Sequence, residues 1–405
     1  MIYKEAATAV CNHFNEDYFD LHQHLLSTGD QTGSRNGSTR EILNFKTVIK
    51  DPTKRCVGGY NRNINVFFLL AEALWIWSGR RDVAFLDTFN ANLKNYSDDG
   101  ISYHAPYGWR MRNYGVGTDI VAREENRHAL QGIDQIEIAL KMLNVNPEDR
   151  RVVVSIWDVN EDLAANSRDI CCNDMVMFKI RNGSLYTTIA NRSNDLNLGL
   201  TTNVFQFSFI SEIMSKILSV GLGDQVHNSQ SLHLYLNHEM TNELSEKISR
   251  DANMPWNSLL YDKATASSMD FSFVDDMCVI DKLKIVDFHI DSIIKLLCDR
   301  TKKKKLVDGL IYEESLKQFS RYLYYIYKLL SIYTDYKVQN NKIEGKTIAI
   351  NELAELGVEM PEFMTTDYHM LSLNFFAQRL FKQNPDSSLI QQFKESVNYK
   401  EVSTY

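Results

Sequence analysis

Cysteine is scarce in this chain, with six residues in 405. No two of them form a Cys-x-x-Cys pair, so the sequence predicts neither a disulfide framework nor a zinc ribbon, and we expect no metal site. This usage favours a reducing compartment, and we expect a cytoplasmic protein.

An excess of positive charge is also lacking. Lysine and arginine together number 44 against 52 acidic residues, which gives a formal net charge of -8. Proteins that hold duplex nucleic acid by neutralising its phosphates usually carry the opposite balance. We therefore expect no nucleic acid among the partners.

Long hydrophobic runs are missing as well. No apolar stretch approaches the roughly 18 to 20 residues that cross a bilayer. Residues 1–20 carry acids where a signal peptide needs a basic end and an apolar run, so the sequence predicts neither a membrane partner nor export. Hydrophobic residues make up 44% of the chain and charged residues 24%, an ordinary globular composition that excludes disorder throughout.

Short β-branched runs are mixed with helical patterns from about residue 33 to residue 289. The segments Arg151–Val159, Met175–Ile180 and Leu185–Ala190 are expected to be strands. The Arg-Asn-Gly-Ser sequence between the last two is typical of a tight hairpin turn. Residues 65–78 are apolar nearly all round and predict a buried helix, with Glu72 as the one acid inside it.

The character of the chain changes after Phe288. Long helical segments rich in lysine and tyrosine follow, such as Ser320–Lys337, and they hold no motif tied to chemistry. We expect one domain over residues 1–292, where the motifs described below make it the catalytic domain, and a helical extension over residues 293–405. The run Lys302–Lys305 is interpreted as a solvated helix end, although such a run also suits an anionic surface.

The most informative residues occur in three segments, DICCND (169–174), ANRSNDLNLGLTTN (190–203) and SLHLYLNH (231–238). They place a thiol, an arginine-serine pair and a histidine-tyrosine pair in order along the chain. His233 and Tyr235 are alternate residues of an extended segment, so they share one face. Each residue taken singly is typical of a core or surface position, but together they suit covalent chemistry on an anionic small molecule.

These motifs resemble those of the thymidylate synthase family, which includes the pyrimidine nucleotide hydroxymethylases. The resemblance covers roughly residues 33–291 and implies an α/β fold, with a mixed sheet and surrounding helices, and a homodimer. Four further segments carry it: SRNGSTREILNF (34–45), TKR (53–55), AEALWIWSG (71–79) and PYGWRMR (106–112).

The resemblance implies a role for each matched residue. Cys172 takes the position of the catalytic nucleophile, with Cys171 in place of the family's proline, and Glu72, Tyr107 and Asn203 match its other catalytic residues. The implied phosphate ligands are Arg35, Arg192 and Ser193, together with Arg150 and Arg151, which reach across a dimer to the partner's site. Asn203 is implied to bind the pyrimidine ring, and His233 and Tyr235 the sugar. The implied folate ligands are Asp195, Leu198 and Gly199.

The family's chemistry accounts for these residue types. Carbon C6 of a uracil ring is a weak electrophile, so attack requires a thiolate, which nearby arginines favour. Attack makes C5 a nucleophile that can take a one-carbon unit from 5,10-methylenetetrahydrofolate, the implied cosubstrate. After folate leaves, hydride transfer gives a methyl group, whereas addition of water gives a hydroxymethyl group.

Departures from the synthases favour water. No tryptophan occurs between residues 82 and 107, where synthases have indoles against folate. Residues 284–292 look like the family's last strand, but the apolar tail that closes synthases is replaced. Asn173 stands in place of a histidine, and Thr201 and Thr202 replace proline and phenylalanine. Since hydride transfer requires a dry, closed site, the sequence favours hydroxymethylation.

The base is predicted from Asn203. A carboxamide can donate and accept at once, as the O4 and N3–H edge of uracil demands, whereas cytosine-specific members tend to have aspartate there. The sequence therefore predicts 5-hydroxymethylation of deoxyuridylate (dUMP), as in phages that replace thymine, with the host cytoplasm as the compartment. The alternatives are a thymidylate synthase with an unusual lid, a dCMP hydroxymethylase and a catalytically idle nucleotide-binding homologue.

Overall fold

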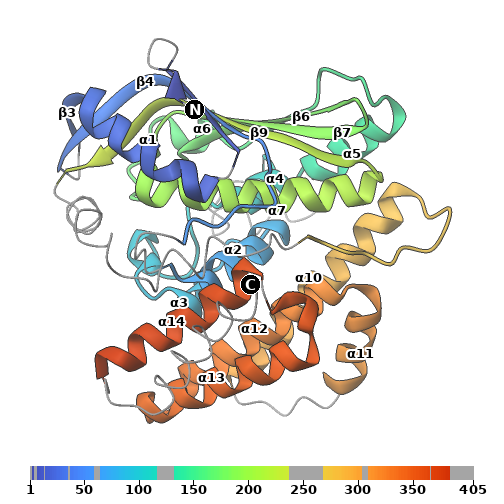
Figure 1. Ribbon diagram of the computed structural model, residues 1–405. Coiled ribbons are helices and arrows are strands. Elements are labelled where there is room, and N and C mark those ends of the chain that lie inside the picture. The colour runs from blue at the N-terminus through green and yellow to red at the C-terminus, as the bar shows by residue number, and fades with distance from the viewer. Residues whose placement is uncertain are drawn as a thin grey trace, which may run out of the picture.

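A mixed sheet forms one side of the molecule (Figure 1). The computed structural model describes residues 2–3, 7–12, 14–34, 37–58, 64–115, 132–236, 268–302, 309–364 and 366–383. Within these ranges nine strands pair in the order β1 (Ile2–Tyr3), β2 (Thr8–Cys11), β4 (Gly37–Ile49), β9 (Gly221–Tyr235), β7 (Ser184–Asn191), β6 (Asn173–Arg181) and β5 (Val153–Ser155), with β3 (Asp30–Ser34) on β4 and β8 (Asn194–Asp195) on β9. Parallel and antiparallel pairs both occur, which confirms the predicted α/β fold with a mixed sheet.

The β6–β7 hairpin follows directly from its sequence. Arg181 pairs with Ser184, and the two residues between them, Asn182 and Gly183, have φ values of 51° and 72°. A two-residue turn with positive φ at both central positions matches the twist of paired strands, and asparagine-glycine adopts this turn readily. The predicted hairpin and its two strands are confirmed.

The strand predicted over Arg151–Val159 is only partly right. β5 covers Val153–Ser155, and the short helix α6 (Val159–Asp162) begins where the strand was expected to end. The backbone N–H groups of Ile156 and Trp157 both donate to Asp174 O, so the regular ladder stops there. The side chain of Asp158 then accepts from Asn160 N and caps the helix.

Helices cover the inner face of the sheet in successive layers (Figure 1). α1 (Phe14–Thr28) and α7 (Thr201–Leu218) pack against the strands, and α2 (Val66–Trp77) packs on α7. The side chain of Asn65 accepts from Phe68 N at the start of α2, and most of its side chains are buried, as predicted for residues 65–78. The smaller helical elements are α3 (Val83–Phe89), η1 (Leu93–Tyr96), α4 (Tyr107–Arg112), α5 (Gln135–Val145) and η3 (Leu196–Leu200).

The strand predicted over residues 284–292 is wrong, because these residues lie inside the helix α10 (Val279–Thr301). Leu283, Val286 and Ile290 are buried at helical spacing, and α10 packs this stripe against α2, α5 and α12. The boundary expected at residue 292 therefore falls within a continuous helix.

The C-terminal helices form the layer farthest from the sheet (Figure 1). In the described part of the chain after α10, four helices follow, namely α11 (Gly309–Phe319), α12 (Arg321–Val338), α13 (Lys342–Glu359) and α14 (Asp367–Gln383), with the turn η5 (Pro361–Phe363) before α14. The helix predicted over Ser320–Lys337 is confirmed, and it packs on α2: the rings of Phe67 and Tyr333 stack with their centres 4.7 Å apart. The division of the chain into a catalytic domain and an extension stays a prediction.

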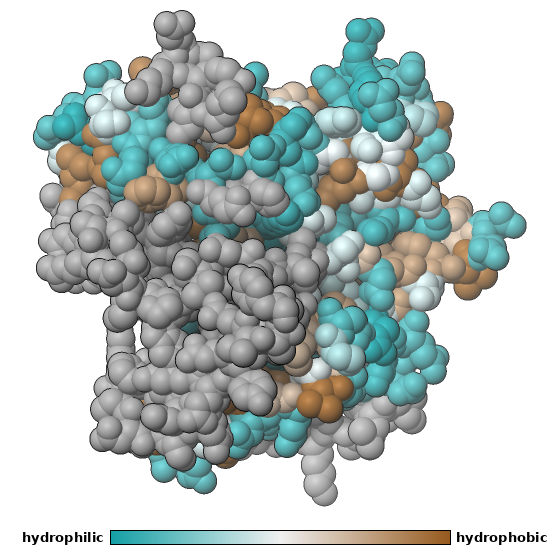
Figure 2. Space-filling model, in the orientation of Figure 1, coloured by the Kyte–Doolittle hydropathy of each residue, from teal (hydrophilic) through white to brown (hydrophobic). Residues whose placement is uncertain are grey.

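The visible surface is mixed in character. Figure 2 shows hydrophilic residues over most of the coloured part of this face, interrupted by smaller apolar patches. Among the described residues, no helix is both long enough and apolar enough to cross a membrane.

Candidate active site

Cys172 lies immediately before β6, at the inner side of the sheet. Its carbonyl accepts from Arg192 N at 3.0 Å, and its Sγ is 3.9 Å from Arg192 Nη2. The residue is half-buried, whereas its neighbour Cys171 is buried. A guanidinium beside a sulfur stabilises the thiolate, which is the form that attacks carbon.

The neighbouring thiol of Cys171 faces different surroundings. Its Sγ lies 3.8 Å from the carbonyl oxygens of Ala105 and Ile156, and the residue is buried. Burial raises the pKa of this thiol well above its ordinary value. Cys171 is therefore placed as a protonated core residue.

The Arg192 side chain is held by the backbone around the two cysteines. Its Nε donates to Cys171 O at 2.6 Å, and its Nη2 donates to Ile170 O at 3.3 Å. The guanidinium also lies 5.8 Å from the centre of the Trp157 ring. Ser193 follows, half-buried, in the short connection between β7 and β8. The cation is thus fixed next to Cys172 before any substrate binds.

Tyr107 reaches the same place from α4. Its hydroxyl hydrogen-bonds to the backbone of Cys172, and its ring stacks on Phe207 of α7 with centres 6.3 Å apart. Burial, with a smaller contribution from the Cys172 thiolate, raises the pKa of Tyr107 well above its ordinary value. α4 lies against the end of α2 so closely that a Cβ on Gly108 would overlap the carbonyl of Ile76.

Glu72 is the acid that the apolar helix α2 carries. It is half-buried and accepts a hydrogen bond from Gln206 Nε2 of α7 at 2.7 Å. Burial raises the pKa of this carboxyl group from 4.5 to about 7, while the Gln206 hydrogen bond opposes the rise. A group with this pKa can take up or release a proton near neutral pH.

Buried asparagines surround Asn203, which lies in the first turn of α7. Asn173 Nδ2, directly after Cys172, donates to Asn203 Oδ1 at 3.1 Å. Asn203 Nδ2 in turn donates to Asn194 Oδ1 at 3.3 Å. The Asn203 amide is therefore held from both sides, and one of its two partners, Asn173, adjoins the Cys172 position.

The predicted sugar and folate ligands lie together at the end of β9. The rings of His233 and Tyr235 are on one side of the strand, with centres 5.2 Å apart, and Asp195 of β8 pairs with His233. The Asp195 carboxylate accepts from the backbone N–H groups of Asn197 and Leu198, at 3.2 and 2.9 Å, and so caps η3. The Leu198 side chain is 52% exposed beside it.

A family model described as thymidylate synthase matches residues 16–297. The chain belongs to the thymidylate synthase family. It is 35% identical over 221 residues to a deoxyuridylate hydroxymethyltransferase of Bacillus phage SP01, covering 54% of this chain and 56% of the relative. Proteins of the same description from Pseudomonas phage M6 and Delftia phage PhiW-14 are 32% and 29% identical and are covered over 61% and 56% of their lengths. The chain thus spans little more than half the length of these relatives.

Two of the predicted phosphate ligands, Arg150 and Arg151, lie far from Cys172 within one chain. The carbonyl of Val152 accepts from Phe178 N, so Arg151 lies level with Lys179 near the far end of β6. At about 3.3 Å per residue, roughly seven residues of strand separate this level from Cys172 by about 23 Å. Arg150 is next to Arg151, whose guanidinium pairs with Asp149 at 2.6 Å. Arg35 lies outside the described residues.

Sequence reasoning missed the partners that hold the site. Gln206 fixes Glu72, and Asn194 holds the amide nitrogen of Asn203. Gln206 follows Asn203 by three residues on α7, so helical spacing could have identified it as a neighbour on the same face. No local pattern indicated Asn194, because its contact depends on how η3 turns the chain.

Proposed function

We propose that the protein converts dUMP to 5-hydroxymethyl-dUMP, with 5,10-methylenetetrahydrofolate as the source of the one-carbon unit. The observation that carries this proposal is Cys172 Sγ 3.9 Å from Arg192 Nη2, with the Tyr107 hydroxyl on the Cys172 backbone and the Asn203 amide bonded to the adjacent Asn173. A cysteine thiolate beside a fixed cation suits attack on the ring of an anionic nucleotide. The names of the phage relatives support the hydroxymethylating branch.

The first step is attack of the Cys172 thiolate on C6 of the ring. A carbon–sulfur bond forms, and the electron pair of the C5–C6 double bond moves toward C5 and O4. The Asn203 amide can donate to the charge that develops on O4, since one of its N–H groups is not used by Asn194. Folate supplies the one-carbon unit that C5 then takes.

Glu72 is the group suited to proton transfer. Its pKa of about 7 lets it gain and lose a proton at neutral pH, whereas Tyr107, with a raised pKa, stays protonated. Tyr107 therefore acts as a hydrogen-bond donor that orients water or substrate, and Glu72 accepts the proton that C5 must lose.

Asp195 and its neighbours fit a folate ring. The Asp195 carboxylate is fixed by two backbone N–H groups and retains lone pairs for the N–H edge of a pterin. The exposed Leu198 side chain offers an apolar surface for the ring face. A Cβ on Gly199 would come to 3.1 Å from Asn194 Oδ1, so the glycine lets this turn lie close to the asparagines.

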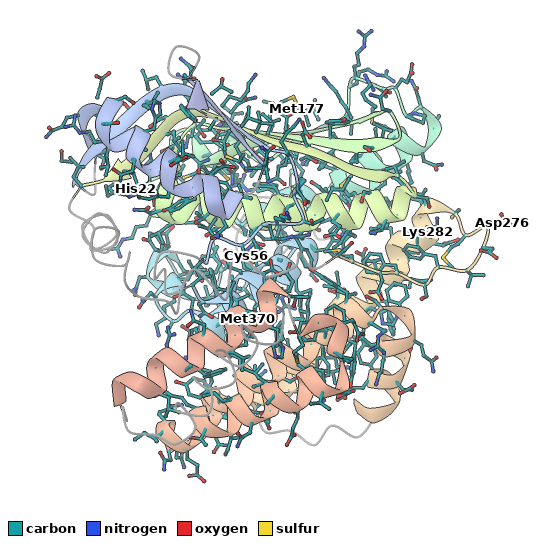
Figure 3. All side chains as sticks on the ribbon, viewed as in Figure 1. His22, Cys56, Met177, Asp276, Lys282 and Met370 are labelled. Atoms are coloured by element: carbon teal, nitrogen blue, oxygen red, sulfur yellow. The ribbon has the colours of Figure 1, made fainter. Side chains whose placement is uncertain are left out.

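The positions of two arginines support a homodimer. Arg150 and Arg151 lie too far from Cys172 to bind the same phosphate within one chain, so we assign them to a partner's site. Met177 lies on the outward face of the sheet, away from α7 (Figure 3). The exposed Met175, two residues earlier on β6, shares this face, and the two side chains offer an apolar surface suited to a second copy. In that arrangement each site would use arginines from both chains.

Mixing inactive variants tests the dimer. Cys172→Ser and the double variant Arg150→Glu with Arg151→Glu should each be inactive alone. Unfolding and refolding them together should restore part of the activity, because mixed dimers contain one site with every group intact. Absence of recovery, in mixtures shown to contain heterodimers, would contradict shared sites.

The reaction itself is tested with dUMP carrying tritium at C5. Tritium release that requires both the protein and 5,10-methylenetetrahydrofolate would separate an enzyme from a catalytically idle binder. We expect tetrahydrofolate as the folate product. Formation of dihydrofolate in step with tritium release would instead identify a thymidylate synthase, because hydride transfer oxidises the folate. Such release from dCMP, and not from dUMP, would identify a dCMP hydroxymethylase.

A further inference from the structure

Four buried asparagines form a directed chain of hydrogen bonds beside the nucleophile. Asn191 Nδ2 donates to Asn173 Oδ1, Asn173 Nδ2 donates to Asn203 Oδ1, and Asn203 Nδ2 donates to Asn194 Oδ1. Asn194 Nδ2 then donates to Ser229 Oγ at 3.2 Å. All five side chains are less than a tenth exposed, so water cannot substitute for a missing partner at low cost.

The chain fixes the orientation of each amide relative to the next. A carboxamide accepts only through its oxygen and donates only through its nitrogen. Turning Asn203 around alone would set its NH2 group against that of Asn173 and its oxygen against that of Asn194. Two unpaired contacts in a buried site are costly, so Asn203 turns only if Asn173 and Asn194 turn with it.

The orientation determines which base edge Asn203 can read. One lone pair of its oxygen and one N–H of its nitrogen remain after the contacts with Asn173 and Asn194. This acceptor-donor pair matches uracil, which presents N3–H and O4. Cytosine presents an acceptor at N3 and an amino donor at C4, so it needs the amide turned around.

We propose that Asn173 is a positioning residue that sets the base specificity of the site through Asn203. It does not contact the base itself. The inference rests on the proposed function and names a determinant of its substrate choice. It also gives a role to the asparagine at a position where the synthases carry histidine.

Asn173→Asp is the direct test. A carboxylate only accepts, so Asn203 must turn its NH2 group toward residue 173 and present the edge that matches cytosine. Asn194 turns with it, because the Ser229 hydroxyl can donate to the Asn194 oxygen as readily as it accepts from the nitrogen. The ratio of kcat/KM for dUMP to that for dCMP should fall about tenfold or more. Asn191→Asp should shift the ratio in the same direction, because Asn173 must then donate to residue 191 and accept from Asn203.

Asn194→Asp is the matched control. It introduces the same carboxylate on the other side of Asn203, but Asn203 already donates to that position. The orientation of Asn203 is unchanged, and the variant should keep the wild-type preference for dUMP. A general effect of buried charge would affect all three variants alike.

The pH profile separates positioning from structural damage. A protonated carboxyl group at residue 173 can donate to Asn203 as the original amide does, so lowering the pH should return Asn173→Asp toward dUMP. The wild-type ratio should be flat over the same range. Binding affinities for the two nucleotides, measured without folate, provide a second readout that does not need turnover.

The proposed function and the role of Asn173 would be overturned by different results. A wild-type protein that does not prefer dUMP in binding or turnover would overturn the proposed function. A wild-type protein that prefers dUMP, together with unchanged selectivity in Asn173→Asp and Asn191→Asp, would overturn the role of Asn173 alone. A loss of selectivity in Asn194→Asp equal to that in the other two would also overturn it.

Discussion

The two adjacent cysteines differ in what surrounds their sulfurs. Cys172 is half-buried with its Sγ close to the guanidinium of Arg192, whereas Cys171 Sγ lies in the core among backbone carbonyls. A cation beside a sulfur favours the thiolate, and burial in the core disfavours it. The assignment of Cys172 as the nucleophile, made by resemblance, thus has a physical reason.

Cys172→Ser should abolish tritium release from dUMP while leaving nucleotide binding within a few-fold of wild type, because a serine hydroxyl is not ionised beside Arg192. Cys171→Ser should keep turnover and lose some stability. Binding by titration calorimetry and turnover under the same conditions check both. Turnover by Cys172→Ser together with its loss in Cys171→Ser would reverse the assignment.

Glu72 predicts a pH dependence of stability. Its carboxyl pKa is about 7 in the folded protein against 4.5 for an ordinary glutamate, so the folded state keeps a proton that the unfolded chain has released. Stability should therefore fall as the pH rises from about 4.5 to about 7. Glu72→Gln removes this loss of stability. The melting temperature of the variant minus that of wild type should therefore increase as the pH rises across that interval.

Thermal unfolding at a series of pH values measures the effect of Glu72→Gln. Glu137→Gln is a suitable control, because Glu137 lies at the surface of α5 and pairs with Lys141. Its melting temperature relative to wild type should show no comparable trend. A difference for Glu72→Gln that stays constant from pH 4.5 to 7 would mean that Glu72 is not held in a protonating environment.

At the scale of elements, sequence reasoning succeeded where local chemistry decides the structure. The asparagine-glycine turn and the apolar run of α2 were predicted because their residues permit few alternatives. The supposed strand at residues 284–292 failed because it was assigned by resemblance, although Leu283, Val286 and Ile290 show a helical period.

The site was predictable to the same extent. Short motifs placed Cys172, Arg192 and Asn203 near one another. Cys172 directly precedes β6, Arg192 directly follows its paired strand β7, and Asn203 lies in the helix α7 that follows. The amides that orient Asn203 were not predictable, since Asn173 and Asn191 meet across β6 and β7 and their hydrogen-bond direction is a three-dimensional property.

The contact between α4 and α2 predicts a strong effect at Gly108. A Cβ there would overlap the backbone carbonyl of Ile76, which cannot rotate away, so α4 must shift and carry Tyr107 from Cys172. Gly108→Ala should lower kcat and destabilise the protein by about 1 to 3 kcal/mol.

Urea unfolding and steady-state kinetics measure these two effects. Gly33→Ala is the control, because nothing lies within 4 Å of a Cβ at that position. It should change neither stability nor kcat appreciably. A Gly108→Ala protein with wild-type kcat would show that the position of α4 does not matter for Tyr107.

The whole molecule is joined by contacts between α2, α7 and the C-terminal helices. Tyr333 of α12 stacks on Phe67 of α2, and a buried ion pair joins Arg55 to Glu212 of α7. The hydroxyls of Tyr322 and Tyr368, on α12 and α14, are 2.9 Å apart close to this arginine. The C-terminal helices therefore complete the core that supports Glu72 and Asn203.

Tyr333→Ala tests whether this shared core is one cooperative unit. All five tryptophans precede residue 292, so their fluorescence reports the catalytic region, while circular dichroism also reports the C-terminal helices. The two urea transitions should coincide in wild type and shift together in Tyr333→Ala, by about 3 to 5 kcal/mol. Tyr96→Ala, at a 54% exposed tyrosine, is the control and should shift neither. Separate transitions would instead favour an independently folding extension.

The mass of the nucleotide product formed in water enriched in heavy oxygen distinguishes hydroxymethylation from methylation. With dUMP and 5,10-methylenetetrahydrofolate, we expect 5-hydroxymethyl-dUMP whose new hydroxyl group carries oxygen from the solvent, formed together with tetrahydrofolate. A product with the mass of thymidylate, without solvent oxygen and with dihydrofolate formed in equal amount, would contradict this expectation.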